Sequence, residues 1–253
     1  MIALKSPSEL ASMRQAGQIV GELLRRLEAV VEPGMSTADL DEMARQTIES
    51  LGGEPAFKGY RGFPGYICTS VNEEVVHGIP GRRVLKSGDI VGLDVGARTG
   101  GYYADAAITV PVGCVSEQAR RLIAVTREAL LAGVQMASPG RRLSDISHAV
   151  QSTVESQGFA VVRDFVGHGI GAQLHEPPQI PNYGAPGAGP VLKPGMVLAI
   201  EPMVNAGRHE VEILEDGWTA VTKDRQLSAH FEHTVAVTEH GPEILTECPK
   251  KKP

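Results

Sequence analysis

Two apolar runs in the sequence each end at a carboxylate. Asp94 follows residues 90–93 in IVGLDVG, and Glu201 follows residues 197–200 in VLAIEP. A strand that is buried on both faces normally ends at a turn residue, because a buried charge without a partner is costly. We therefore infer that each acid serves a site and that its strand holds it in place.

Three further residues have the types and settings of metal ligands. Asp105 lies eleven residues after Asp94, beyond a glycine-rich segment that predicts a hairpin with the two acids on neighbouring strands. His168 lies between glycines in VGHGIG, and Glu232 enters the β-rich run HFEHTVAV. Acids gathered without cations raise one another's pKa, and a divalent metal removes that cost. Four carboxylates and one imidazole suit Mn, Fe(II) or Co better than a thiolate-bound zinc, and two ions about 3.5–4 Å apart are typical of hydrolytic sites.

An internal repeat predicts how these residues come together. VLKSGDIVGLD at 84–94 aligns without a gap to VLKPGMVLAIE at 191–201, at an offset of 107 positions, and residues 32–52 align to 138–158 at an offset of 106. We therefore expect one domain over 1–253 with two pseudo-symmetric halves, at approximately 6–111 and 116–238. Asp94 and Glu201 would then lie at equivalent strand ends and face each other across the joint.

Each half of the sequence has the pattern of two helices followed by strands. SPSE at 6–9 is a capping box that predicts a helix to about residue 31, and Thr37 is expected to cap a second helix to about residue 51. Ser116 opens a third helix to about residue 137, and a fourth is expected over 143–157. Strands are expected over 65–71, 89–96, 102–111, 160–165, 196–205, 212–221 and 232–238. The fold class is α+β, with helices on one side of a curved antiparallel sheet.

The composition argues against several classes of protein. The 253 residues are 42% hydrophobic and 21% charged, and no apolar run approaches the length of about 20 residues that spans a bilayer. The formal net charge of −6 argues against a broad nucleic-acid-binding face, and Lys250 to Lys252 form only a short basic tail. Cys68, Cys114 and Cys248 are widely spaced, which argues against a disulfide framework. The first residues show no export signal, so a cytoplasmic location is expected.

Taken together, the candidate ligands resemble those of the methionine aminopeptidases, which have the pita-bread fold. The settings LDVG, YYADAA, GHGIG, IEPM and FEHT carry this resemblance, and NEEVVHGIP at 72–80 strengthens it. The resemblance covers nearly the whole chain. The 33 residues from His168 to Glu201 leave no room for the helical insertion of the type II enzymes, so the short bacterial type I form is implied.

The resemblance implies a site with two divalent ions. Asp94 and Asp105 would bind one ion, His168 and Glu201 the other, and Asp105 and Glu232 would span both. The implied ions are Co2+, Mn2+ or Fe2+, with Zn2+ and Ni2+ as alternatives. A water or hydroxide bridging the ions would be the nucleophile. Glu201 would take the water's proton and later pass it to the leaving amine.

The resemblance also assigns residues to the substrate. His175 would donate a hydrogen bond to the scissile carbonyl oxygen, and His77 would lie near the scissile amide and help to position or protonate it. His230 stands near Glu232, where the family often has a glutamine, and would adjust the metals through their ligands. Two residues depart from the pattern that is usual in the family. Leu174 stands in place of an aromatic residue and Pro177 in place of a glutamate, and both departures bear on the shape of the substrate pocket. The residues that match the methionine pocket are Tyr60, Phe63, Cys68 and Trp218.

The implied function is removal of the initiator methionine from nascent proteins whose second residue is small. On that rule a chain that begins Met1-Ile2 would keep its own methionine. The protein is expected to be a monomer with neither DNA nor membrane as a partner, and a transient contact with the ribosome stays open. The first alternative is a proline-directed peptidase with the same fold and metal set. The second is a pita-bread binding protein without catalysis, which the presence of all five ligand types argues against.

Overall fold

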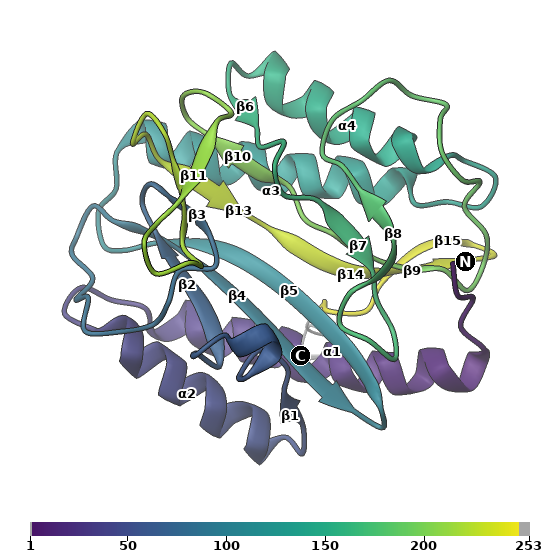
Figure 1. The fold of residues 1–253 in the computed structure, drawn as a ribbon, viewed down its shortest axis with the longest axis horizontal. Coiled ribbons are helices and arrows are strands. Elements are labelled where there is room, and N and C mark those ends of the chain that lie inside the picture. The colour runs from purple at the N-terminus through teal and green to yellow at the C-terminus, as the bar shows by residue number, and fades with distance from the viewer. Residues whose placement is uncertain (1, 248–253) are drawn as a thin grey trace, which may run out of the picture.

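Four α-helices and a largely antiparallel set of strands make up residues 2–247, the part of the chain that this computed structural model describes (Figure 1). The helices are α1 (Pro7–Val30), α2 (Thr37–Ser50), α3 (Glu117–Met136) and α4 (Leu143–Ser156). The first half contains β1 (Glu54–Pro55), a 3-10 turn at Tyr60–Gly62, β2 (Ile67–Val71), β3 (Glu74–Val76), β4 (Ile90–Thr99) and β5 (Tyr102–Pro111). The second half contains β6 (Ala160–Val161), β7 (Gly167–Gly169), β8 (Glu176–Ile180), β9 (Val197–Ile200), β10 (Met203–Asn205), β11 (Val211–Ile213), β12 (Ala220–Thr222), β13 (Ser228–His230), β14 (Glu232–Thr238) and β15 (Gly241–Ile244).

The largest sheet runs through both halves of the chain. Its strand order is β1-β4-β5-β14-β9-β7-β8, with β2 also paired to β4 and β15 to β14. Because β5 of the first half pairs with β14 of the second, the two halves form one continuous surface. Two three-stranded sheets, β13-β10-β6 and β11-β12-β3, complete the β-structure of the described residues. Within residues 2–247, no helix is both long and apolar enough to cross a membrane.

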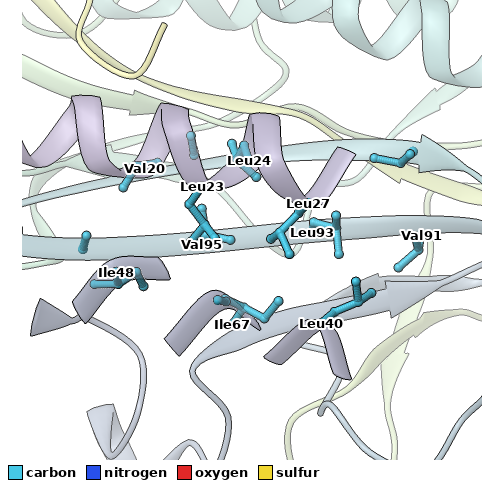
Figure 2. Close-up of a cluster of buried hydrophobic side chains, with 14 of the residues drawn as sticks. Val20, Leu23, Leu24, Leu27, Leu40, Ile48, Ile67, Val91, Leu93 and Val95 are labelled. Carbon is cyan, nitrogen blue, oxygen red and sulfur yellow. The ribbon is translucent and has the colours of Figure 1, made fainter. Parts of the chain in front are cut away.

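The helices cover one face of this sheet, as the sequence predicts. Leu23 and Leu27 of α1 pack with Leu93 and Val95 of β4 in one buried cluster (Figure 2). Successive side chains of a strand point to opposite faces, so Asp94 is directed away from α1. The second half repeats this arrangement. Its helices α3 and α4 pack on alternate residues of β9 and β14 in a cluster that includes Leu130, Val134, Leu143, Ile146, Leu198, Ile200, Val235 and Val237.

Helix α2 begins differently from the prediction. Its N-cap is Ser36, whose extended backbone (φ −88°, ψ 156°) lets its hydroxyl accept the Asp39 N–H at 3.2 Å. Thr37 is already helical, and its hydroxyl accepts the N–H of Gly81 at 2.9 Å. The prediction of Thr37 as the cap is therefore wrong by one residue. The predicted caps Ser6 and Ser116 are confirmed.

Equivalent contacts recur in the two halves. Ser36 forms an isolated β-bridge with Val84, and Arg142 forms one with Val191. The next residue after each of these valines also accepts a matching hydrogen bond. The Gly34 N–H donates to the Leu85 carbonyl at 2.9 Å in one half, and the Gly140 N–H donates to the Leu192 carbonyl at 3.0 Å in the other. These matched contacts support the expected repeat, and its division at 6–111 and 116–238 stays a prediction.

Several predicted strands differ from the observed ones. The expected strand 196–205 is broken at Glu201 and Pro202 into β9 and β10, which belong to different sheets, since proline cannot donate to a ladder. The expected strand 212–221 is a hairpin, β11 and β12, that turns at Gly217 (φ 77°). Only the first two residues of the expected strand 160–165 are in a strand, β6. The strands β1, β3, β7, β8, β13 and β15 lack a counterpart in the prediction.

Candidate metal centre and substrate pocket

The hairpin of β4 and β5 brings the two aspartates together. Its turn consists of Gly100 and Gly101, whose φ values of 57° and 85° suit a two-residue connection between strands. The resulting register places Asp94 opposite Ala107 and Gly96 opposite Asp105. Residues two apart on a strand, and residues directly opposite, share a face of the sheet. Both acids therefore lie on the same face, as predicted from the glycine-rich spacing.

The register of β14 adds Glu232 to this face. Ala107 of β5 pairs with Asp94 on one side and with Glu232 on the other. Because Ala107 has only a methyl side chain, the two carboxylates have open space between them. The hydroxyl of Thr234, two residues further on, accepts the Asp105 N–H at 3.1 Å and lies 2.8 Å from the Asp105 carbonyl oxygen and 3.1 Å from Asp105 Oδ1. These contacts fix Asp105 on the seam between the two halves.

Strands β7 and β9 supply the remaining two candidate ligands. His168 pairs with Ala199, and Glu201 follows Ala199 by two residues. The His168 Nε2 atom lies 3.5 Å from Asp105 Oδ2 and 3.5 Å from Glu201 Oε1. Its Nδ1 atom lies 2.9 Å from the Gly169 carbonyl oxygen, which can only accept, so Nδ1 carries the proton. The lone pair of Nε2 therefore faces the carboxylates, which is the tautomer that binds a metal.

Electrostatics in this cluster favour a bound cation. Burial, followed by the charge of Asp105, raises the pKa of Asp94 and of Glu201 well above the usual carboxyl value. Burial and neighbouring acids do the same to the pKa of Glu232, and burial raises the pKa of Asp105 to about 7. The Oδ1 atom of Asp94 is buried without a hydrogen-bond partner. A divalent ion would supply the missing partner and offset the repulsion.

The donor set also fits a divalent metal by its chemistry. Ligand atoms of Asp105, His168 and Glu232 all lie within 4.8 Å of one another, and all three residues are buried. Asp94 and Glu201 line the same cavity. Oxygen donors with one imidazole suit first-row divalent ions, as the sequence suggests.

All of the residues predicted as metal ligands, catalytic groups or pocket residues line one cavity that opens to solvent. Their assignment to metal or substrate stays a prediction. Phe57 and Arg61 line the cavity too and were not predicted; Phe57 belongs to the aromatic-rich stretch 57–66, whereas no sequence feature singles out Arg61. The complete lining is Phe57, Tyr60, Arg61, Phe63, Cys68, His77, Asp94, Asp105, His168, Leu174, His175, Glu201, Trp218 and Glu232.

One wall of the cavity is apolar and polarizable. The rings of Phe63 and Trp218 meet edge to face with centroids 5.1 Å apart. Leu174 is buried and packs in the same cluster as these two rings. Burial, with a further contribution from the charge of Asp94, raises the pKa of the Cys68 thiol, so Cys68 is not an activated nucleophile. Such a wall suits an unbranched thioether side chain.

Two histidines that are not candidate ligands face the cavity. The hydroxyl of Tyr60 lies 2.9 Å from His175 Nδ1, and the two rings stack with centroids 5.3 Å apart. Burial, then the neighbouring His168, lowers the pKa of His175 to about 4, so the imidazole is neutral at pH 7. His77 has a left-handed backbone (φ 60°) and lies edge to face with Phe165 at 5.5 Å, and burial lowers its pKa.

His230 lies outside the cavity lining but close to Glu201. Its Nε2 atom is buried without a hydrogen-bond partner, 3.9 Å from Glu201 Oε2. Burial lowers its pKa to about 3, and the nearby His77 contributes in the same direction. An influence of His230 on the metals stays a prediction. Cys248 and the basic tail at Lys250 to Lys252 lie outside the described residues.

Comparison with known proteins agrees with this geometry. Residues 11–239 match metallopeptidase family M24. The chain is 57% identical to methionine aminopeptidase 1 of Bacillus subtilis, over 97% of this chain and 99% of that protein. It superposes on the crystal structure of methionine aminopeptidase from Thermotoga maritima with a TM-score of 0.96 and 53% identity, covering 98% of this chain and 100% of that one. Prolidase from Pyrococcus furiosus shares the fold (TM-score 0.78, 23% identity), and the match covers 98% of this chain and 66% of the prolidase chain.

Proposed function

Because this chain belongs to metallopeptidase family M24, we propose that it is a methionine aminopeptidase, which hydrolyses the peptide bond that follows an N-terminal methionine. The observation that carries the proposal is the gathering of four buried carboxylates and one neutral imidazole around a single open cavity. This cluster accounts for the metal dependence of the reaction. The assignment of the substrate rests on the relatives of more than 50% identity that cover nearly the whole chain.

Five side chains would hold two divalent ions in the cavity. Asp94, Asp105, His168, Glu201 and Glu232 are the proposed ligands, with Co2+, Mn2+, Fe2+, Zn2+ and Ni2+ as the candidate ions. When bound, such ions lower the pKa of water and polarise a carbonyl group. The side chains of the protein itself would carry out the proton transfer and the orientation of the substrate.

Glu201 is the proposed general base and acid. It is buried at the wall of the cavity, where it can take a proton from the attacking water and pass it to the leaving amine. His175 would donate from Nε2 to the carbonyl oxygen, because Tyr60 already occupies Nδ1. His77 would lie beside the scissile amide. The residues proposed to contact the methionine side chain are Tyr60, Phe63, Cys68 and Trp218.

The substrates proposed are nascent proteins whose second residue is small. Their synthesis in the cytoplasm supports a cytoplasmic location for this chain. A monomer is proposed because one chain supplies all of the site residues. A transient contact with the ribosome stays a prediction.

A metal titration tests the proposal. Protein depleted of metal would be titrated with Mn2+, Co2+ or Fe2+ while hydrolysis of Met-Ala-Ser is measured, with Asp105→Ala as the variant that lacks a proposed bridging ligand. Activity should appear with added metal, and the variant should stay at least about 10³-fold less active. An Xaa-Pro peptide distinguishes the proline-directed alternative, since it should not be cleaved. The non-catalytic alternative would be favoured if the metal-depleted protein stayed fully competent in binding and no added metal produced hydrolysis.

A further inference from the structure

A buried ion pair joins the N-terminal segment to the loop that carries His175. Lys5 Nζ lies 2.6 Å from Glu176 Oε2, and the two side chains are only 5% and 13% exposed. The Arg14–Glu243 pair also joins the two ends of the chain, but its side chains are 42% and 37% exposed. Buried pairs of this kind tolerate little movement, because displacement of one partner leaves the other charge without compensation.

The ion pair occupies space that the surrounding backbone leaves free for it. The Lys5 N–H donates to the Gly195 carbonyl at 2.7 Å, which fixes the start of the side chain. A Cβ atom at Gly171 would lie 2.2 Å from Lys5 Cε and 2.6 Å from Nζ, so any larger residue at position 171 would displace the lysine side chain. The second oxygen of Glu176 accepts the Gln173 N–H at 3.1 Å. Glu176 therefore connects the lysine to the loop as well as to β8.

The loop between β7 and β8 depends on such contacts for its position. Residues 171–175 have no helix or strand hydrogen bonding, and His175 directly precedes Glu176. Apart from Glu176, the loop is held by the Tyr103 N–H, which donates to the Gly171 carbonyl at 2.9 Å, and by the Ile170 N–H, which donates to the Val197 carbonyl at 3.1 Å. The buried side chain of Leu174 and the bond between Tyr60 and His175 Nδ1 add to these contacts. Loss of the lysine would leave the Glu176 carboxylate buried and unpaired. The carboxylate would then turn toward water and displace the histidine beside it.

We propose that Lys5, through its ion pair with Glu176, is a positioning residue that sets the location of the His175 imidazole in the cavity. This inference rests on the proposed function of the site. Lys5 does not line the cavity and so contacts neither the substrate nor the reacting atoms. Its contribution would reach the reaction only through His175.

The first test is Lys5→Met, which keeps the length of the side chain and removes its charge. With Met-Ala-Ser and saturating metal, kcat should fall about tenfold or more while KM changes by less than about twofold, because the displaced group acts on the transition state. An unchanged kcat in a folded variant would overturn the proposal. A wild-type protein that fails to hydrolyse Met-Ala-Ser would instead refute the proposed function, so the two failures are distinguishable.

A double-mutant cycle tests whether Lys5 acts through His175. In a His175→Ala background, Lys5→Met should lower kcat by less than about twofold, because the group that it positions is already absent. A loss of the same size in both backgrounds would contradict the proposal. The Arg14→Met variant is the matched control, since it breaks the Arg14–Glu243 ion pair near the same end of the chain and away from the cavity. Its kcat should equal that of the wild type within about twofold.

A second variant separates positioning from stability. Lys5→Met combined with Glu176→Gln removes both charges, so thermal stability should recover relative to Lys5→Met alone. The tether is still missing in the double variant, and kcat should therefore stay about tenfold below the wild-type value. Recovery of kcat together with the melting temperature would show a merely structural role and overturn the proposal.

Discussion

The hydrogen bond between Tyr60 and His175 determines which nitrogen of the histidine is left for the substrate. A phenol is a much stronger acid than a neutral imidazole N–H, so the Tyr60 hydroxyl donates and His175 Nδ1 accepts at 2.9 Å. The single proton of the neutral ring is then on Nε2. In this tautomer His175 can donate toward the oxygen on which charge develops during hydrolysis.

Replacement of His175 by alanine should therefore lower kcat by about 10²- to 10³-fold, the usual loss when one oxyanion donor is removed. KM for Met-Ala-Ser should change little, because the bond strengthens mainly in the transition state. Steady-state kinetics at saturating metal measure both constants. A fall confined to KM would assign His175 to ground-state binding instead.

Tyr60→Phe keeps the ring that stacks on His175 and removes only the hydroxyl. A lost neutral hydrogen bond at a partly exposed position corresponds to about a fivefold to tenfold lower kcat. The control is Tyr66→Phe, since Tyr66 belongs to the same aromatic-rich stretch 57–66 but lies outside the cavity lining, and this variant should behave as wild type. Equal rates for Tyr60→Phe and wild-type protein would mean that Nδ1 needs no partner.

At the residue scale, most of the residues that line the cavity could be named from the sequence and from the resemblance. The glycine-rich segment between Asp94 and Asp105 predicts the hairpin that brings them together. The internal repeat predicts that Asp94 and Glu201 lie at equivalent strand ends. Lys5 and Arg61 could not be identified, because their positions depend on contacts with segments far away in the sequence. A lysine before a helix cap reads as solvent-exposed, and only the fold buries it against Glu176.

Secondary structure was predictable where local signals determine it. Helices carry their own caps, so Ser6 and Ser116 locate the starts of α1 and α3 correctly. Long paired strands such as β5 and β14 have clear apolar patterns. Short strands such as β7 and β13 have three residues each, and only their partners in space define them. Their polar and glycine-rich sequences contain no strand signal.

The close packing of α1 against the C-terminal strand region gives a prediction at the same scale. A Cβ atom at Gly17 would lie 2.2 Å from the backbone oxygen of Leu245, which cannot move aside as a side chain can. Gly17→Ala should therefore lower the free energy of unfolding by about 1–3 kcal/mol despite the better helix propensity of alanine. Urea denaturation measures the change. Gln18→Ala, at an exposed position of the same helix, should stay within about 0.5 kcal/mol of wild type.

At the scale of the whole molecule, the site lies where the two halves join. Asp94 and Asp105 come from the first half, and His168, Glu201 and Glu232 from the second. The joint therefore carries a layer of buried acids on the sheet face opposite the two apolar clusters, each of which belongs to one pair of helices. A cation held there would bind side chains of both halves, so the metal should stabilise the folded protein as well as take part in hydrolysis.

The pH dependence of stability provides a direct measure of this effect. Burial raises the pKa of Asp105 to about 7 in the folded state, above its value of about 3.9 in an unfolded chain. The folded protein therefore holds a proton that the unfolded chain releases, and stability falls as pH rises through this range. Buried histidines act oppositely, since burial lowers the pKa of His168 to about 4, but their effect weakens above about pH 6.5, where an unfolded histidine is less than half protonated.

Between about pH 6.5 and 7.5 the four buried carboxyls with raised pKa values outweigh this weakening histidine effect, and the melting temperature of metal-free protein should fall by about 2 °C. Divalent metal at about 1,000 times its dissociation constant should raise the melting temperature by about 10 °C, and by more at pH 7.5 than at pH 6.5, because the ion replaces the proton. Thermal melts with and without Mn2+ measure both values. Asp105→Asn removes the titrating group and should flatten the metal-free slope. A metal-free melting temperature that instead rises over this interval would mean that the acids are already compensated within the protein, and the buried layer would not require a cation.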